Sequence, residues 1–309
     1  MLSSAVERRP YKARVGGSIP SAPTTVGAVV QLVRIPACHA GGRGFESRPL
    51  RQFTQPSRLV KSKDEVAVKA LLLAAGEGTR LRPLTLSTPK CLVEIGGKPL
   101  LAHWLDSLRE SRAFDHAIVN THYLADKVEA FIRQGPHADW VETSLEAELL
   151  GPGGTLMHHQ KALADSDFLV AHADNFSLID WRGFIAAHEG RPPGCVGTMM
   201  TFETDDPRSC GIVEMNAAGV VTAMHEKVER PPGRLANAAV FLFSPEVFDI
   251  IRSAENKAVF DISRDVVPRL FGRLATYQNR AYHRDIGTSA SLDTARRDYD
   301  RLSRSSMPG

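Results

Sequence analysis

The stretch from Leu71 to Leu92 combines residue types that could bind phosphate groups. The apolar run Val68–Leu73, whose length suits a buried parallel strand, ends in a turn that contains Gly76 and Gly78. Glycines let backbone N–H groups approach an anion without obstruction by a Cβ atom. Three cations follow on the same stretch: Arg80, Arg82 and Lys90. The stretch predicts a phosphate-binding loop, and the alternative is a tight turn with solvated basic side chains.

Spacing rules out two common phosphate-binding motifs. A Walker loop requires GxxxxGK[ST], and no stretch of the sequence has this pattern. A dinucleotide fingerprint requires GxGxxG at the start of a helix, but Leu81 stands where the third glycine would be, and Pro83 follows. What remains is the string LAAGEGTRLRPLT, followed by Pro89-Lys90. This string resembles the signature of the sugar-1-phosphate nucleotidyltransferase (NDP-sugar pyrophosphorylase) family.

The resemblance implies which residues contact a nucleoside triphosphate. The expected nucleotide-binding loop is Ala74, Ala75, Gly76, Glu77, Gly78, Thr79 and Arg80. Arg80 and Lys90 are expected to bind the triphosphate and to stabilise pyrophosphate as it leaves. Hydrogen bonds to such charged groups contribute about 1.5–3 kcal/mol each when desolvated. Positioning and electrostatics supply most of the catalysis in phosphoryl chemistry, so no covalent nucleophile is required.

Two aspartates are candidates for a metal site. Asp174 ends the string FLVAHAD, and Asp285 opens DIGT, so each carboxylate follows an apolar segment. Mg²⁺ prefers oxygen ligands and often combines one or two carboxylates with substrate phosphates and water. The resemblance implies that both aspartates hold Mg²⁺ and that Asp174 is catalytic, although Ala173 replaces the family's usual glycine. The alternative for each aspartate alone is a helix cap or a solvated turn residue.

The resemblance also predicts where the sugar phosphate and the base bind. Glu226-Lys227 matches an EK motif that binds the sugar and its phosphate, and Asn237 stands at a sugar-contacting position, although an isolated EK is usually a solvated ion pair. Gly151 is expected in the base pocket, with Pro152 where the family commonly has threonine. Glu146, or alternatively Glu148, could accept hydrogen bonds from guanine N1 and N2, whereas uracil and thymine present flanking carbonyls. The pocket therefore favours GTP.

Alternating strands and helices must position these residues. Apolar runs predict strands over 68–73, 91–95, 116–120, 140–144 and 168–172, and helices over 100–108, near 126–132 and from Gly151. Further strands are expected over 195–202, 211–215, 220–225, 238–243 and near Thr276, with helices over 245–251, 263–270 and 289–302. This order predicts an α/β fold, a single Rossmann-like, doubly wound domain with a mixed, mainly parallel sheet. Ligands of such sheets bind beyond the carboxyl ends of the strands.

Charge and composition divide the chain unevenly. Residues 1–66 carry 11 of its 38 Lys/Arg and only 4 of its 35 Asp/Glu, so the remainder is mildly acidic and does not suit a nucleic-acid binder. Residues 1–65 are expected to be a disordered or spurious extension, 66–304 the nucleotidyltransferase domain and 305–309 a tail. Two strings, at 2–23 and 29–50, are similar to conceptual translations of tRNA genes, which suggests a misplaced start codon. An organellar transit peptide is the alternative.

The sequence as a whole predicts a cytoplasmic, Mg²⁺-dependent enzyme that makes an NDP-sugar. The four cysteines form no CxxC pair, and no apolar run has the roughly 18 residues of a membrane span. The expected partners are GTP and mannose 1-phosphate, with no nucleic acid or membrane, and with a possible homo-oligomer. The alternatives are a glucose-1-phosphate thymidylyltransferase, an N-acetylmuramate-1-phosphate uridylyltransferase, and a non-catalytic regulator that binds nucleotide sugars.

Overall fold

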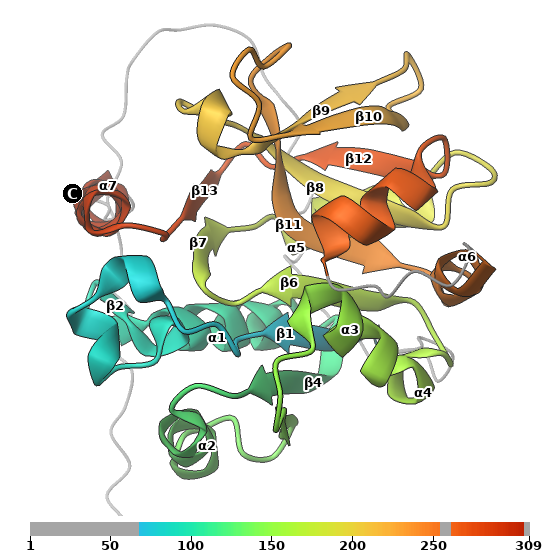
Figure 1. Ribbon diagram of the computed structural model, residues 1–309. Helices are drawn as coiled ribbons and strands as arrows, with labels where there is room; N and C mark the ends of the chain where they lie inside the picture. The colour runs from blue at the N-terminus through green and yellow to red at the C-terminus, as the bar shows by residue number, and fades with distance from the viewer. Residues whose placement is uncertain (1–67, 254–260, 306–309) are drawn as a thin grey trace, which may run out of the picture. The chain divides into compact units, whose positions relative to one another are not determined.

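The computed structural model describes residues 68–253 and 261–305, all of which belong to one compact unit of the chain (Figure 1). The predictions about residues 1–65 lie outside this described part. Among the described residues, no helix has both the length and the apolar character that crossing a membrane requires.

The described residues form a central sheet of nine strands. Its order is β10-β9-β11-β6-β1-β4-β5, with β8 paired to β11 and β12 paired to β8. The strands are β1 (Val68–Leu73), β4 (Phe114–Thr121), β5 (Val141–Leu145), β6 (Phe168–His172), β8 (Gly197–Glu203), β9 (Gly211–Met215), β10 (Val221–Glu226), β11 (Leu235–Phe243) and β12 (Leu274–Gln278). Strands β6, β1, β4 and β5 are parallel, whereas β11 is antiparallel to its neighbours β6, β8 and β9. The expected mixed α/β sheet is confirmed.

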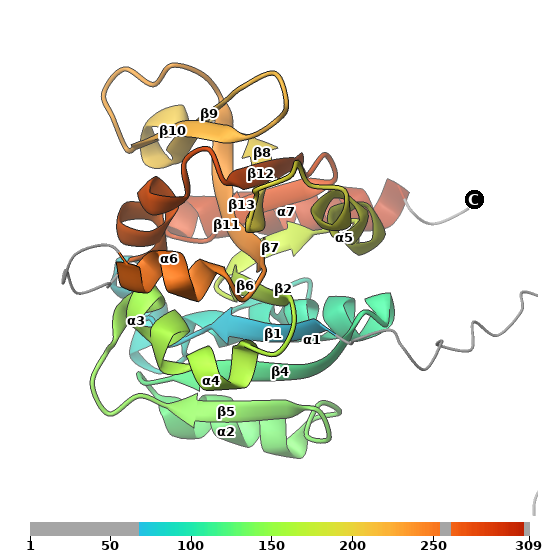
Figure 2. The ribbon, with the colours of Figure 1, turned by 90° about the vertical axis from the view of Figure 1, so that its right-hand side faces the viewer.

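Helices cover both faces of the sheet because its central strands are apolar on both sides. The helices are α1 (Leu100–Ser111), α2 (Ala125–Gln134), α3 (Gly151–His158), α4 (Gln160–Leu163), α5 (Trp181–Glu189), α6 (Val247–Ser253) and α7 (Ser289–Ser305). On β1, Ala70 and Leu72 join a buried cluster with α1, α2 and α5. Leu71 and Leu73 join a second cluster with α3, α4 and α6, which Figure 2 shows close to one another. The alternation of strand side chains thus separates two cores.

A third, smaller cluster connects the segment after β1 to the end of the chain. Here β13 (Tyr282–Asp285) pairs antiparallel with β7 (Asn175–Leu178), and β2 (Glu94–Ile95) pairs with β3 (Lys98–Pro99). The buried members of the cluster are Leu81, Val93, Ile95, Leu100, Phe176, Ile286, Leu292 and Ala295. Because these residues pack together, the segment that carries Arg80 and Lys90 lies beside the segment that carries Asp285.

Three parts of the fold differ from the sequence-based expectation. The expected strand over 91–95 is a 3₁₀ turn, Lys90–Leu92, followed by the short strand β2. The expected helix over 263–270 is a π-helical turn, Ile262–Val266, followed by a 3₁₀ helix, Val267–Leu270. Pro268 has no N–H to donate, so a regular α-helix is interrupted there. Strand β7 and helix α5 were not expected.

Candidate functional site

The glycine loop leaves the carboxyl end of β1 and is held at both of its ends. At its start, the N–H of Ala74 donates to Oδ1 of Asn120 on β4 at 2.7 Å. At its end, Gly78 has a φ of 61°, and the Thr85 hydroxyl donates to the Gly78 carbonyl at 2.8 Å. A Cβ at Gly78 would stand 3.0 Å from Cβ of Lys90, so the position requires glycine for both its backbone and its space.

Lys90 joins the two aspartates that the sequence singles out. Its Nζ donates to Oδ2 of Asp174 at 2.7 Å and lies 3.8 Å from Oδ1 of Asp285. Asp174 comes just after β6 and Asp285 ends β13, so two separate elements deliver the carboxylates to one ammonium group. The Lys90 residue is only 7% exposed, which shields this pairing from water. The structure therefore brings the two distant aspartates together, as expected.

The charge state of Asp174 follows from its surroundings. Burial raises the pKa of Asp174, but the positive charges of Lys90 and His172 outweigh burial, so the pKa lies below its ordinary value. The side chain is therefore a carboxylate at neutral pH. An ionised aspartate with an exposed partner at Asp285 offers the oxygen donors that a hard divalent cation prefers.

The donor set fits a cation that is completed by substrate. Within residues 68–253 and 261–305, no group of three or more His, Cys, Asp or Glu side chains is arranged to hold a metal ion. Asp174 and Asp285 would supply two carboxylates, and phosphate oxygens and water would supply the remaining ligands. This is the coordination that Mg²⁺ commonly has when it binds nucleotides.

Arg80 lies beside this carboxylate pair. It is exposed, and its guanidinium passes so close to Gly287 that a Cβ there would stand 2.9 Å from Nη2 of Arg80 and 2.9 Å from Oδ2 of Asp285. The DIGT segment thus provides a flat backbone surface on which the guanidinium rests. Arg80, Lys90 and the glycine loop together place positive charge and open backbone N–H groups at the carboxyl ends of β1 and β6.

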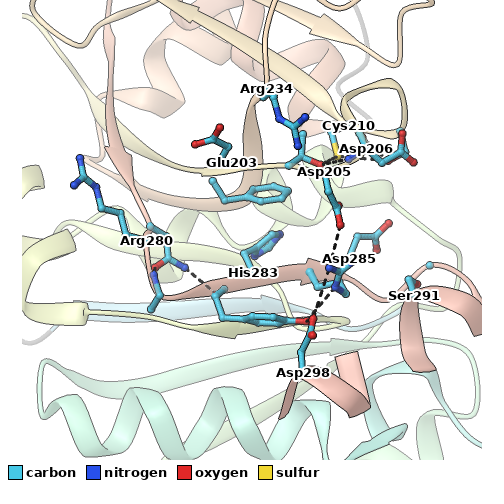
Figure 3. A pocket seen from close by; sticks show the side chains of 18 of the residues that line it. Glu203, Asp205, Asp206, Cys210, Arg234, Arg280, His283, Asp285, Ser291 and Asp298 are labelled. Carbon is cyan, nitrogen blue, oxygen red and sulfur yellow. Dashed lines mark hydrogen bonds and ion pairs between the residues drawn. The ribbon is translucent and has the colours of Figure 1, made fainter. Parts of the chain in front are cut away.

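A cavity of about 1040 Å³ extends from Arg80 and Asp285 (Figure 3). Figure 3 shows Glu203, Asp205 and Arg234 on one side, and His283, Asp285 and Asp298 on the other. Its lining also includes Arg80, Phe202, Thr204, Asp206, Ser209, Cys210, Gln278, Asn279, Arg280, Ala281, Tyr282, Arg284, Gly287, Thr288, Ser291 and Arg301. The mixture of carboxylates, guanidinium groups and amides suits a hydroxyl-rich, charged ligand.

An ionic network fixes one wall of the cavity. Arg284 Nη2 donates to Asp205 Oδ2 at 3.4 Å and lies 3.6 Å from Asp298 Oδ2. The Tyr282 hydroxyl donates to the same Asp298 oxygen at 2.8 Å and receives a hydrogen bond from Arg284 Nε at 3.0 Å. Burial raises the pKa of Tyr282 to about 12, so its hydroxyl stays protonated and able to donate. This network ties β13 to α7 and to the loop after β8.

His283 forms an uncharged part of the same wall. Burial, together with the charges of Arg284 and His172, lowers the pKa of His283 to about 3. Its Nδ1 lies 2.7 Å from the Ser177 hydroxyl, and its ring centroid is 4.3 Å from that of Phe202. The neutral imidazole and the phenyl ring give the cavity an apolar surface between its charged groups.

The expected sugar-binding residues lie apart from the lining of this cavity. Glu226 ends β10, and the next residue, Lys227, places its Nζ 3.4 Å from the Glu226 carboxylate. The Lys227 N–H donates to the carbonyl of Cys210, which does line the cavity. Asn237 donates to the Ser263 hydroxyl at 3.2 Å and accepts from the N–H of Ala239 at 2.8 Å. The EK pair therefore adjoins the cavity through the backbone of Cys210.

Glu146 is buried rather than open to a ligand. Its residue is 5% exposed, and its carboxylate accepts from Asn120 Nδ2 at 2.8 Å, from the Leu150 N–H at 3.1 Å and from the Thr155 hydroxyl. Gly151 begins α3 with a φ of 71°, and its carbonyl accepts from the same hydroxyl at 3.0 Å. A carboxylate has about four acceptor sites, so at most one remains for a base. Glu148, the alternative, is exposed.

Several cavity residues carry weak signals in the sequence. His283 and Arg284 directly precede Asp285, so the motif that identifies the aspartate also marks their position. Asp205 and Cys210 lie in a loop without any recognisable pattern, and only the chain fold brings them to Arg284 and Lys227. Asn120 is a single polar residue in an apolar strand, and its partners depend on strand register.

Comparison with known proteins agrees with this geometry. The Nucleotidyl transferase family matches residues 69–301. A mannose-1-phosphate guanylyltransferase of Mycobacterium tuberculosis is 31% identical over 226 residues, which cover 72% of this chain and 61% of the relative. A UTP–glucose-1-phosphate uridylyltransferase of Synechocystis is 30% identical over 219 residues, which cover 66% of this chain and 55% of the relative. The chain thus spans about three fifths of the length of such curated relatives.

A solved structure shares the fold. A proposed glucose-1-phosphate thymidylyltransferase from Bacillus anthracis, in complex with sucrose, superimposes with a TM-score of 0.65 at 21% identity. The match covers 79% of this chain and 98% of that protein. The arrangement of strands and helices around the glycine loop is therefore a known architecture.

Proposed function

Because the chain belongs to the Nucleotidyl transferase family, we propose that it transfers a nucleotidyl group from a nucleoside triphosphate to a sugar 1-phosphate. The observation that carries this proposal is the convergence of Asp174 and Asp285 on Lys90 beside the glycine loop. Carboxylates for a divalent cation, cations for a triphosphate and a polar cavity for a sugar then meet at one edge of the sheet. Nucleotidyltransferases generally use a divalent metal, and Mg²⁺ is our specific assignment.

The proposed reaction is an in-line displacement at the α-phosphorus. An oxygen of the sugar phosphate forms the new bond to phosphorus, and the bond to the β-phosphate oxygen breaks, so pyrophosphate leaves with the electron pair. Arg80 and Lys90 bind the triphosphate oxygens on which negative charge increases. When bound by Asp174 and Asp285, Mg²⁺ supplies further neutralisation of phosphate charge. The glycine loop, residues 74–80, orients the triphosphate with its N–H groups.

We assign GTP as the preferred nucleotide. Glu146 and Gly151 adjoin the start of α3, where a carboxylate can accept from the two adjacent donors of guanine. The similarity to a mannose-1-phosphate guanylyltransferase supports this assignment. UTP and dTTP are the alternatives, since a uridylyltransferase is similar to the same extent.

We assign mannose 1-phosphate as the preferred sugar phosphate. Glu226 and Lys227 would bind the sugar and its phosphate, Asn237 would contact the ring, and the adjoining cavity would receive the remaining hydroxyl groups. The free thiols of Cys91 and Cys195 among the described residues suit a reducing compartment, and we place the reaction in the cytoplasm. Association of copies into a homo-oligomer remains part of the proposal.

A pyrophosphate-release assay tests the proposal. The full-length protein is assayed with GTP, UTP, dTTP and ATP against mannose, glucose and N-acetylmuramate 1-phosphates, with and without a chelator. We expect turnover with GTP and mannose 1-phosphate, and its loss when divalent cations are removed. Asp174→Asn and Asp285→Asn should each lower kcat by about two orders of magnitude or more, because each removes a charge at the reacting phosphate.

The matched control is Asp139→Asn, which removes an exposed carboxylate paired with Arg109 on the far end of α1. This variant should keep the wild-type rate. Nucleotide binding without any pyrophosphate release, in every combination, would favour the non-catalytic regulator instead. Normal rates in both aspartate variants would remove the metal assignment.

A further inference from the structure

Asn120 lies at the point where the glycine loop and the base-side loop come closest. It is the seventh residue of β4, pairs in register with Leu73 at the end of β1, and is 3% exposed. Its Oδ1 accepts from the N–H of Ala74 at 2.7 Å. On the other side, its Nδ2 donates to the Glu146 carboxylate at 2.8 Å and lies 3.3 Å from the Thr155 hydroxyl. One amide therefore contacts both loops.

The partners of Asn120 determine how its amide is oriented. The Ala74 N–H can only donate, so it must face the amide oxygen, and the Glu146 carboxylate accepts, so it faces the amide NH₂ group. A short side chain that accepts at one end and donates at the other satisfies both partners at once. Neither an aliphatic residue nor an aspartate of the same size can do this. The strand position thus requires an amide for hydrogen bonding.

Glu146 extends the connection to the start of α3. It accepts from Asn120, from the Leu150 N–H at 3.1 Å and from the Thr155 hydroxyl, and the Thr155 hydroxyl also reaches the Gly151 carbonyl at 3.0 Å. The network runs without a gap from Ala74, the first residue of the phosphate loop, to Leu150 and Gly151. Buried, fully satisfied networks of this kind hold their members in one geometry.

We propose that Asn120 is a positioning residue that fixes the distance between the triphosphate-binding loop and the base-side loop. The assignment of nucleotide to these loops rests on the proposed function, whereas the mechanical coupling of residues 74–79 to residues 150–155 does not. A nucleoside triphosphate must contact both loops at the same time. A shift of either loop would therefore weaken nucleotide binding and reduce discrimination among bases, although Asn120 touches no ligand.

Four variants of the full-length protein test the coupling. Asn120→Asp keeps the acceptor for Ala74 but places a second carboxylate against Glu146, and Asn120→Ala leaves both partners unpaired without adding charge. The double variant Asn120→Asp/Glu146→Gln exchanges the two groups, since the amide introduced on the Glu146 side can donate to the new carboxylate and still accept from the Leu150 N–H. Thr198→Val is the control, because it removes a buried hydroxyl on β8 that lies 3.0 Å from His188 Nδ1, away from both loops.

Hydrogen–deuterium exchange and steady-state kinetics are measured on each variant. We expect Asn120→Asp and Asn120→Ala to speed exchange in both 74–79 and 150–155, and to raise the KM for nucleotide about ten- to a hundredfold with a smaller change in kcat. The double variant should restore exchange and KM to within about threefold of wild type. Thr198→Val should leave exchange in both loops unchanged even if the melting temperature falls.

Two results would overturn the proposal. Faster exchange confined to residues 74–79 would show that Asn120 holds only its own neighbour, and no coupling would exist. Failure of the double variant to restore exchange, in a protein that melts like the wild type, would exclude the donor–acceptor arrangement. If the wild type turns over no nucleotide, the proposed function fails, but the exchange measurements still decide whether the two loops are coupled.

Discussion

Gly287 is the residue on which the position of the Arg80 guanidinium depends most directly. An added Cβ would stand 2.9 Å from Nη2 and 3.1 Å from Cζ of Arg80, but these atoms end a flexible side chain that can move away. We therefore expect Gly287→Ala to fold normally and to lower kcat/KM for nucleotide about ten- to a hundredfold. Gly233→Ala is the matched control, because a Cβ there meets only Ile212 at 4.0 Å. Equal kinetics in both variants would show that Arg80 does not bind the triphosphate.

The thiols of Cys91 and Cys210 should differ sharply in reactivity. Burial raises the pKa of Cys91 to about 12, and this residue is fully buried, whereas Cys210 is half-buried and lines the cavity. Because the thiolate is the reactive form, we expect a maleimide to modify Cys210 first in the native protein. Peptide mass spectrometry identifies the labelled site, and a saturating sugar 1-phosphate should slow labelling of Cys210. Labelling of Cys91 at the same rate would contradict the packing described here.

Residues of the site differ in how far the sequence alone could place them. Arg80, Lys90, Asp174 and Asp285 stand in strings whose order of residue types is informative, and the structure gathers them as expected. Asn120 could not be recognised, because its role comes from partners on β1 and on the segment before α3. The enclosed position of the Glu146 carboxylate was equally inaccessible, since burial of a glutamate depends on donors that tertiary packing supplies.

At the scale of elements, apolar runs located the strands well and irregular helices poorly. Strands β1, β4 and β6 are buried on both faces, so their sequences are continuously apolar and easily recognised. The turns over Ile262–Val266 and Val267–Leu270 have helical periodicity, but Pro268 prevents one regular hydrogen-bond pattern. Helix α5 carried a readable signal in Asp180, which caps it by accepting from the Gly183 N–H at 3.0 Å.

The contact between α5 and the start of β6 should make stability depend on pH. Oδ2 of Asp167 lies 3.0 Å from Nε2 of His188, and this hydrogen bond lowers the pKa of Asp167 despite partial burial. A carboxyl whose pKa is lower in the folded state stabilises the fold above its unfolded pKa of about 3.9, and this contribution is lost as pH falls through the folded value. Asp167→Asn should therefore be less stable than wild type at pH 6, and the difference should shrink below about pH 4.

Urea denaturation between pH 3 and pH 7 measures that difference directly. Asp293→Asn, at an exposed position of α7 whose contact with Arg296 is 4.0 Å long, provides the control and should differ little from wild type throughout. A difference between wild type and Asp167→Asn that stays constant with pH would mean that the hydrogen bond does not favour the ionised form.

At the scale of the whole molecule, the site forms where two halves of one sheet meet. Strand β11 joins antiparallel to β6, so the parallel half that carries the glycine loop continues into the half that carries β8, β9 and β10. The expected doubly wound topology placed ligands at the carboxyl ends of β1 and β6. It could not place the cavity, because the cavity depends on how β13 and α7 return to the start of the domain. Such a return is a property of long-range packing and leaves no local pattern in the sequence.

Removal of residues 1–65 should leave turnover and the melting temperature unchanged. The first described strand begins at Val68, the family match begins at residue 69, and the partners named for the site residues all lie within 74–301. The matched control removes residues 1–73 and so deletes β1, which pairs with both β4 and β6 at the centre of the sheet. We expect that control to be unfolded, because it loses a fully buried central strand. A clear loss of activity or stability in the shorter deletion, measured by pyrophosphate release and thermal unfolding, would show that the basic N-terminal segment belongs to the functional enzyme.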